Sequence, residues 1–150
     1  MTARPDIAYT VSKLCEANKG PSEAHKTIMK HLWRYLKGTQ NLALPLGGRC
    51  DGNNLHLRAY SDASFADDLT SRASTGGHIV YLGDGPVHWR TKKQTIVASS
   101  STKAEFMNLT PTGMSLLWIN NLLQELNLPQ NRPHLIMTDS QNARLNVLNP

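Results

Sequence analysis

The chain has 150 residues, enough for one domain or for one domain and part of another. Its 39% hydrophobic and 18% charged residues are typical of a soluble globular protein, and no apolar run approaches the ~20 residues of a membrane span. The net charge of +5 resides in residues 1–50, which hold eight Lys or Arg against three Asp or Glu, while the other hundred residues are balanced. A basic arm beside a neutral body with acidic sites suits a protein that binds polyanions.

The N-terminus, Met1–Asp6, lacks the apolar stretch of a secretory signal, which favours an intracellular protein. Cys15 and Cys50 are isolated from each other and from any Cys/His cluster, so neither a disulfide framework nor a zinc site is expected. The histidines show no ligand spacing, and we expect none of them to bind a metal: His25, His31, His56, His78, His88 and His134.

Two helices are expected in the first third, around residues 7–15 and 22–37, with Gly20-Pro21 between them and Gly38 at the end. At ~100° per residue, the apolar residues of the second helix share one face: Ala24, Ile28, Leu32, Tyr35 and Leu36. Its basic residues share the opposite face: Lys26, Lys30, Arg34 and Lys37. A solvated surface is the first explanation of this basic face, and contact with phosphates is the second.

The Pro- and Gly-containing stretch 44–54 predicts a loop between a helical segment, 1–47, and a second domain, 48–150. From Leu55 the apolar residues alternate with polar ones, which predicts a strand running into Asp62. Further strands are expected at 77–82 and 87–91, separated by the Gly-Asp-Gly-Pro turn at 83–86. Together these three strands make an antiparallel meander.

A long helix should follow, because the hydroxyls of residues 99–102 offer N-caps. Its helical period continues through Met107, Leu117, Leu122 and Leu126, and we expect Pro111 and Gly113 to kink or split it. After a loop at 129–133, a short strand at 134–138 leads to Asp139, and residues 140–148 begin another helix. The order β-β-β-α-β-α predicts a mixed α/β fold that stops before it is complete.

Three carboxylates stand where elements meet: Asp62 and Asp139 at strand ends, and Glu105 one turn into the long helix. Side chains at such places can converge, and hydrolysis of a phosphodiester with two metal ions needs converging carboxylates. Each has a structural alternative, since Thr102 and Glu105 fit a capping box and the two Asp residues fit turns or N-caps. Asp67 and Asp68 are interpreted as exposed loop acids.

Six segments, in this order, resemble the polyproteins of copia-type LTR retrotransposons. They are RPDIA at 4–8, HLWRYLKGT at 31–39, YSDA at 60–63, STG at 74–76, WRTKKQ at 89–94 and SSSTKAEFM at 99–107. The resemblance extends along essentially the whole chain. It implies that residues up to about 45 end a reverse transcriptase, and that the rest has a ribonuclease H-like fold, with the remaining Pol polyprotein as its partner.

The resemblance implies a metal-dependent endoribonuclease that cuts the RNA strand of RNA–DNA hybrids during reverse transcription. Asp62, Glu105 and Asp139 match the catalytic carboxylates of that family, and two Mg²⁺ ions, or Mn²⁺, would be their cofactors. Ser64, Phe65 and Ser140 depart from the usual pattern, as do Asn108, Pro111 and Gly113 within the long helix. The resemblance also implies that the protein is located in the cytoplasm, in virus-like particles or in the nucleus.

Further residues are candidates for nucleic-acid contact beside the basic helix face: Lys92, Lys93 and Gln94 for phosphates, and Ser100, within 99–101, and Asn142 for sugar hydroxyls. Solvation and helix capping explain them equally well. The resemblance also implies a fourth acidic residue and a fifth strand beyond Pro150. The chain alone is therefore expected to cut hybrids weakly or not at all.

Three rival functions remain open. An integrase or transposase would have the acidic order Asp, Asp, Glu, whereas here the Glu lies between the two Asp residues, which favours ribonuclease H. A catalytically dead nucleic-acid-binding remnant is favoured by the altered Ser64, Pro111 and Ser140. A purely structural interaction domain has only the general fold in its favour.

Overall fold

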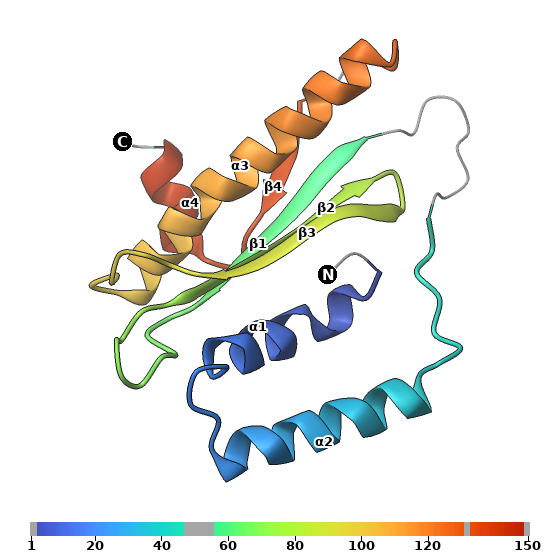
Figure 1. Cartoon of the computed structure of the whole chain (residues 1–150). Coiled ribbons are helices and arrows are strands. Elements are labelled where there is room, and N and C mark those ends of the chain that lie inside the picture. Colours follow the sequence, from blue (N-terminus) through green and yellow to red (C-terminus); the bar gives the residue numbers. More distant parts are fainter. Residues whose placement is uncertain (1–2, 47–55, 131–132, 149–150) are drawn as a thin grey trace. The chain divides into compact units, whose positions relative to one another are not determined.

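A computed structural model describes residues 3–46, 56–130 and 133–148 of the chain (Figure 1). The chain divides into two compact units, Met1–Leu44 and Pro45–Pro150. The boundary that the sequence predicts between residues 47 and 48, and Cys50 nearby, lie outside the described residues. Within the described ranges, no helix has both the length and the apolar character to cross a membrane.

The first unit is a short helical hairpin. A 3₁₀ turn, η1 (Pro5–Ile7), leads into α1 (Ala8–Glu16), and α2 (Glu23–Gly38) follows the Gly20-Pro21 break. Ser22 caps α2, because its backbone N–H donates to His25 Nδ1 at 3.0 Å and its hydroxyl lies 2.7 Å from the same nitrogen. Among the described residues of α1 and α2 only Ala8 is buried, and the Cys15 thiol is free and exposed.

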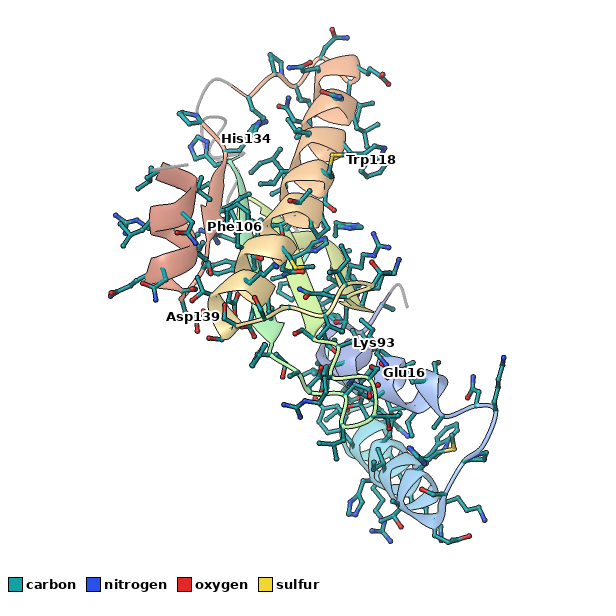
Figure 2. All side chains as sticks on the ribbon, turned by 90° about the vertical axis from the view of Figure 1, so that its left-hand side faces the viewer. Glu16, Lys93, Phe106, Trp118, His134 and Asp139 are labelled. Atoms are coloured by element: carbon teal, nitrogen blue, oxygen red, sulfur yellow. The ribbon has the colours of Figure 1, made fainter. Side chains whose placement is uncertain are left out.

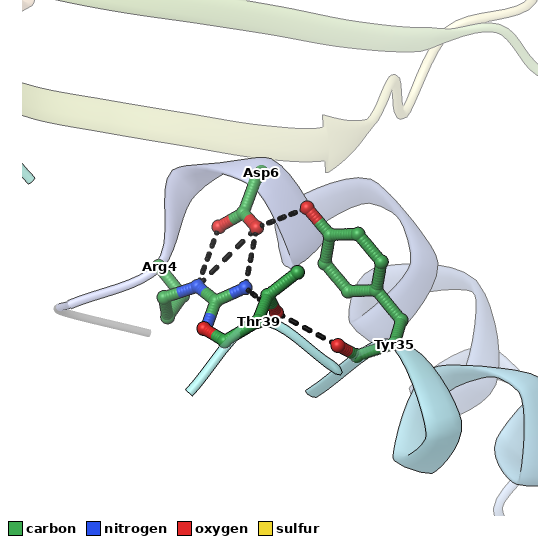
Figure 3. A network of polar contacts seen from close by, with 4 residues as sticks. All are labelled: Arg4, Asp6, Tyr35 and Thr39. Atoms are coloured by element: carbon green, nitrogen blue, oxygen red, sulfur yellow. Dashed lines mark hydrogen bonds and ion pairs between the residues drawn. The ribbon is translucent and has the colours of Figure 1, made fainter. Parts of the chain in front are cut away.

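A polar network joins the start of this unit to the end of α2 (Figure 3). The Arg4 guanidinium donates to Asp6 at 2.7 Å and to the Thr39 hydroxyl at 2.8 Å, and Tyr35 donates to Asp6 at 2.8 Å. The hydrogen bond from Arg4 is the largest cause that lowers the pKa of Asp6 to about 2. This network, rather than an apolar core, connects the ends of the unit.

The predicted apolar face of α2 is only partly covered. Leu32 and Leu36 are half-buried, whereas Ile28 is 42% and Tyr35 43% exposed. One short partner helix is too small to cover it. The four basic residues are exposed: Lys26, Lys30, Arg34 and Lys37.

The second unit is a four-stranded sheet with two helices. Its strands are β1 (Leu57–Ser64), β2 (Thr75–Leu82), β3 (Gly85–Lys93) and β4 (Leu135–Met137), in the order β3-β2-β1-β4. β1, β2 and β3 pair antiparallel, and β4 pairs parallel with β1. α3 (Ser101–Glu125) separates β3 from β4, and α4 (Gln141–Leu148) follows β4. The predicted meander and the mixed α/β class are confirmed.

α3 crosses one face of the sheet (Figure 1), and the core lies between them. The buried members are Leu57, Ala59 and Val80 from the sheet with Leu116, Ile119 and Leu123 from α3. The long helix that the sequence predicts is present, but three of the leucines whose spacing indicated it lie outside this core: Leu117, Leu122 and Leu126 are 57%, 40% and 59% exposed. α3 has apolar residues around its whole circumference, so periodicity alone does not identify the buried face.

α3 also runs unbroken through Pro111 and Gly113, where a kink or a break was expected. A proline inside a helix costs about 3 kcal/mol, but full burial of Leu116, Ile119 and Leu123 contributes roughly 1.5–3 kcal/mol for each side chain. Two hydroxyl groups also form hydrogen bonds within this part of α3. Thr112 donates to the Asn108 carbonyl at 2.7 Å, and Ser115 donates to the Pro111 carbonyl at 3.0 Å. Packing against the sheet therefore outweighs the local preference.

Candidate metal centre

Two of the three candidate carboxylates are placed by strand pairing. β1 and β4 are parallel, with Tyr60 opposite Met137. Asp62 and Asp139 each lie two residues beyond that pair, so the parallel register sets them side by side at the same end of the sheet. Both residues are exposed.

Glu105 comes from the first turns of α3 and is only 8% exposed. Its Oε1 accepts a hydrogen bond from the Ala63 backbone N–H at 3.0 Å, directly beside Asp62. The capping-box alternative is wrong, because Ser100 is the N-cap and accepts from the Lys103 N–H at 3.1 Å. Glu105 is thus turned toward the end of β1 instead of back to the start of its own helix.

The three side chains meet at one point. One carboxylate oxygen from each of Asp62, Glu105 and Asp139 lies within 4.8 Å of the others, which makes the group able to hold a metal ion. Figure 2 shows Asp139 beside the N-terminal part of α3, on the side where Phe106 also lies. The convergence expected from the sequence is therefore present in the fold.

The electrostatics of Glu105 favour a cation at this point. Burial is the largest cause that raises the pKa of Glu105 to about 7, and the negative charges of Asp62 and Asp139 raise it further. Its Oε2 is buried and has no hydrogen-bond partner among the residues that the structure describes. An unpartnered buried oxygen among three carboxylates fits a hard divalent cation, since such a cation would supply the missing partner and neutralise the repulsion.

Asn108 holds the backbone next to the site through hydrogen bonds. The sequence indicates it only as a departure from the family pattern. It is buried, and its Nδ2 donates to the Asp62 carbonyl at 2.9 Å, the Gly77 carbonyl at 2.8 Å and the Ser61 hydroxyl at 2.9 Å. A Cβ at Gly76 would overlap its side-chain oxygen. The sequence signal was a polar residue three positions after Glu105, on the same helix face.

The loop between β1 and β2 is organised by two acids that the sequence suggested were simply exposed. Asp68 accepts from the backbone N–H groups of Thr70 at 2.8 Å and Ser71 at 2.7 Å, and also from the Lys93 ammonium. The hydrogen bond from Lys93 is the largest cause that holds the pKa of Asp68 far below its usual range. Asp67 accepts from the Thr75 hydroxyl at 2.8 Å. The loop is therefore fixed to the sheet.

The remaining candidate residues have mixed surroundings. Lys26, Lys30, Arg34 and Lys37 belong to the first unit, while Lys92 and Asn142 are exposed on the second. Three others have structural roles. Lys93 pairs with Asp68, Gln94 donates to the Ala104 carbonyl at 2.9 Å, and Ser100 caps α3.

Comparison with known proteins gives relatives along the whole chain. The retrovirus-related Pol polyprotein from transposon RE1 of Arabidopsis thaliana is 42% identical over 147 residues, 98% of this chain and 10% of that polyprotein. The one from transposon RE2 of the same plant is 40% identical over 147 residues, also 10% of its length. This chain thus spans about a tenth of these relatives.

A shorter relative is covered over most of its length. The secreted RxLR effector protein 161 of Plasmopara viticola is 37% identical over 119 residues, which make up 79% of this chain and 82% of that protein. No protein-family model matches the chain.

Proposed function

We propose that this chain, which is similar to one segment of the retrovirus-related Pol polyproteins of transposons, carries a ribonuclease H-type domain. Residues 48–150 would form that domain and hydrolyse the RNA strand of an RNA–DNA hybrid. Residues 1–47 would be the end of the preceding reverse transcriptase. The hybrid and the rest of the Pol polyprotein are the partners in this proposal.

The observation that carries the proposal is the convergence of Asp62, Glu105 and Asp139 from three separate elements to within 4.8 Å. Their oxygens are the ligands that Mg²⁺ and Mn²⁺ prefer. Two such ions, held by these three residues, would activate a water molecule and stabilise the leaving oxygen of a phosphodiester.

Each residue has a distinct task in this scheme. The Ala63 N–H holds Glu105 through Oε1, and Oε2 is left without a partner from the described residues. Asp62 and Asp139 are exposed and are the carboxylates that an incoming nucleic acid can reach. Asn108 binds the backbone at Asp62 from α3, the helix that also carries Glu105, so the two carboxylates keep their separation.

Strand order and carboxylate order both support this function. A meander followed by a helix and a strand that pairs parallel with the first agrees with the ribonuclease H-like fold that the resemblance implies. The acidic residues occur as Asp, Glu, Asp along the chain, whereas the rival integrase order is Asp, Asp, Glu. The proposal therefore favours hybrid cleavage over strand transfer.

The test is cleavage of a hybrid whose RNA strand carries a fluorophore, measured with Mg²⁺, with Mn²⁺ and with a chelator. We expect slow, metal-dependent cleavage of the RNA strand alone, and its loss in Asp62→Asn. Asp84→Asn is the matched control, because Asp84 is 75% exposed in the β2–β3 turn and pairs only with Arg58 among the described residues. It should cleave at the wild-type rate.

The outcomes separate the two leading functions. Hybrid binding without any cleavage at high Mn²⁺, both by this chain and by a form extended with a C-terminal segment that supplies the fourth acidic residue, would overturn the nuclease and leave the nucleic-acid-binding remnant. Cleavage that survives Asp62→Asn would assign the activity to a contaminant. A chain that neither binds nor cuts the hybrid contradicts both.

A further inference from the structure

A groove runs along the flank of α3 that faces β2 and β3. One hollow of about 240 Å³ is lined by the ends of β2 and β3 and by residues 107, 108 and 111 of α3. A second of about 530 Å³ is lined by His88 on β3 and by Met114, Ser115 and Trp118 on α3. Arg90 and Pro111 line both hollows, so the two adjoin. In Figure 2, Trp118 lies on the opposite side of α3 from Phe106 and Asp139.

The sheet wall of this groove is positively charged. Arg90 and Lys92 alternate on one face of β3 and are exposed, and no described residue pairs with either. None of the described residues that line the two hollows is acidic. Burial is the largest cause that lowers the pKa of His78 to about 4 and also lowers that of His88, so both rings are neutral at pH 7. The charge there comes from Arg90, Lys92 and Lys93, and Lys93 is held by Asp68.

The helix wall is apolar and open. Trp118 is 62% and Met114 66% exposed, although both line the groove. At the other end, Gln94 Oε1 is buried without a hydrogen-bond partner in the described part of the chain, while its Nε2 donates to the Ala104 carbonyl. Arg90 lines the same hollow as the exposed indole, and Lys92 lines the adjoining one. Cations and an open indole along one groove attract an anion that carries flat aromatic groups.

We propose that this groove binds a single-stranded segment of a polynucleotide, with Arg90 and Lys92 on the phosphates and Trp118 stacked on a base. A base must be unpaired to stack on an indole, which selects a single strand over a duplex. The choice of a polynucleotide over an acidic peptide rests on the proposed function. The link between the groove and the candidate metal centre supports this choice. Asn108 lines the groove and also donates to the carbonyl of Asp62, one of the three carboxylate residues.

The test measures binding of a fluorescein-labelled oligothymidylate of about 12 nucleotides through its fluorescence anisotropy. A chelator is present, so that neither a metal ion nor cleavage contributes. Trp118→Ala should weaken binding roughly 10-fold, and Trp118→Phe should retain most of the affinity. Replacing Arg90 and Lys92 by Ala should lower the log–log salt slope by about 0.7 for each phosphate that is no longer neutralised. Thermal unfolding checks that each variant remains folded.

Matched controls come from positions outside the groove. Trp33 on α2 is 67% exposed, so Trp33→Ala removes an equally accessible indole, and Lys19→Ala with Arg144→Ala removes an equal charge from exposed positions. Both should bind as the wild type does. If the control variants lose the affinity and the groove variants keep it, the proposal is overturned.

An oligoglutamate of equal charge distinguishes the peptide alternative. The proposal fails if oligoglutamate displaces the oligothymidylate at equal concentration and binds Trp118→Ala as tightly as the wild type. The groove would then be a site for an acidic peptide. The proposed nuclease is tested separately. Loss of groove binding with hybrid cleavage intact removes only this inference, and intact groove binding without cleavage removes only the nuclease.

Discussion

The two units of the chain use polar networks in opposite ways. In the first unit, Arg4, Asp6, Tyr35 and Thr39 form a network near the surface, around helices that bury only Ala8 among their described residues. In the second, the network of Asn108 is buried beneath a packed helix. Hydrogen bonds that water can replace contribute little, whereas a buried group that loses its partner costs its full desolvation. The surroundings of a network decide how much it stabilises the fold.

The largest effect is expected from Asn108→Ala. Three acceptors on β1 and β2 would lose their donor inside the protein, and we expect the free energy of unfolding to fall by about 4 kcal/mol. Urea unfolding measures it. Asn142→Ala, at an exposed position of α4, is the control and should change the stability by less than about 0.5 kcal/mol. Equal effects at the two positions would remove the distinction between buried and exposed networks.

Glu105 should give the metal-free protein a pH dependence of its own. Because its pKa is raised from 4.5 to about 7 in the fold, the protonated side chain stabilises the fold below pH 4.5. That stability is lost as the pH rises through about 7, by about 3 kcal/mol in total. Thermal unfolding between pH 4 and 8 should show this loss as the difference between the wild type and Glu105→Gln, because the lowered pKa of His78 gives both proteins the opposite trend. An identical profile in both would place the titration elsewhere.

Gly76→Ala tests the packing around the buried network. The new Cβ would overlap the Asn108 side-chain oxygen, so we expect a loss of about 2 kcal/mol. Gly77→Ala is the neighbouring control, because its Cβ would find nothing nearer than 3.9 Å. The Asn108→Ala variant lacks the side-chain oxygen that the new Cβ would overlap. In that variant, Gly76→Ala should therefore lower the free energy of unfolding much less than it does in the wild type. Additive losses would mean that the two residues do not interact.

The smallest effect is expected in the first unit. Asp6 has its pKa lowered to about 2, so its pairing stabilises the fold above pH 3.8 and is lost as the pH falls through about 2. Its partners are near the surface, and Asp6→Asn should cost less than about 1 kcal/mol at pH 7. Far-ultraviolet circular dichroism during thermal unfolding measures it. A loss as large as that of Asn108→Ala would contradict the comparison.

The order of elements could be predicted because the alternation in β1 and the turn between β2 and β3 are local signals. The buried face of α3 could not, because Leu117 and Leu116 are equally apolar neighbours and only the sheet selects between them. Pro111 was misleading for the same reason: its local cost is real, and the packing that offsets it comes from residues far away in the sequence.

The site follows the same division. Asp62, Glu105 and Asp139 could be named from motifs and element ends, yet their approach depends on the parallel register between β1 and β4. The role of Asn108 depends on two carbonyls in other strands. Asp68 was interpreted as exposed because its ammonium partner, Lys93, is 25 residues away. Residue types show the available chemistry, and long-range pairing decides which groups meet.

β4 gives the site a dynamic property of its own. The strand has three residues, pairs with β1 through three positions and is exposed along its whole length. Such an edge opens far more readily than the core, and its opening would carry Asp139 away from Asp62 while the meander and α3 stay closed. A divalent cation that needs both carboxylates would bind only the closed form, so occupancy and closure become linked equilibria. Slower amide hydrogen exchange at Leu135–Met137 would then report on the cation directly.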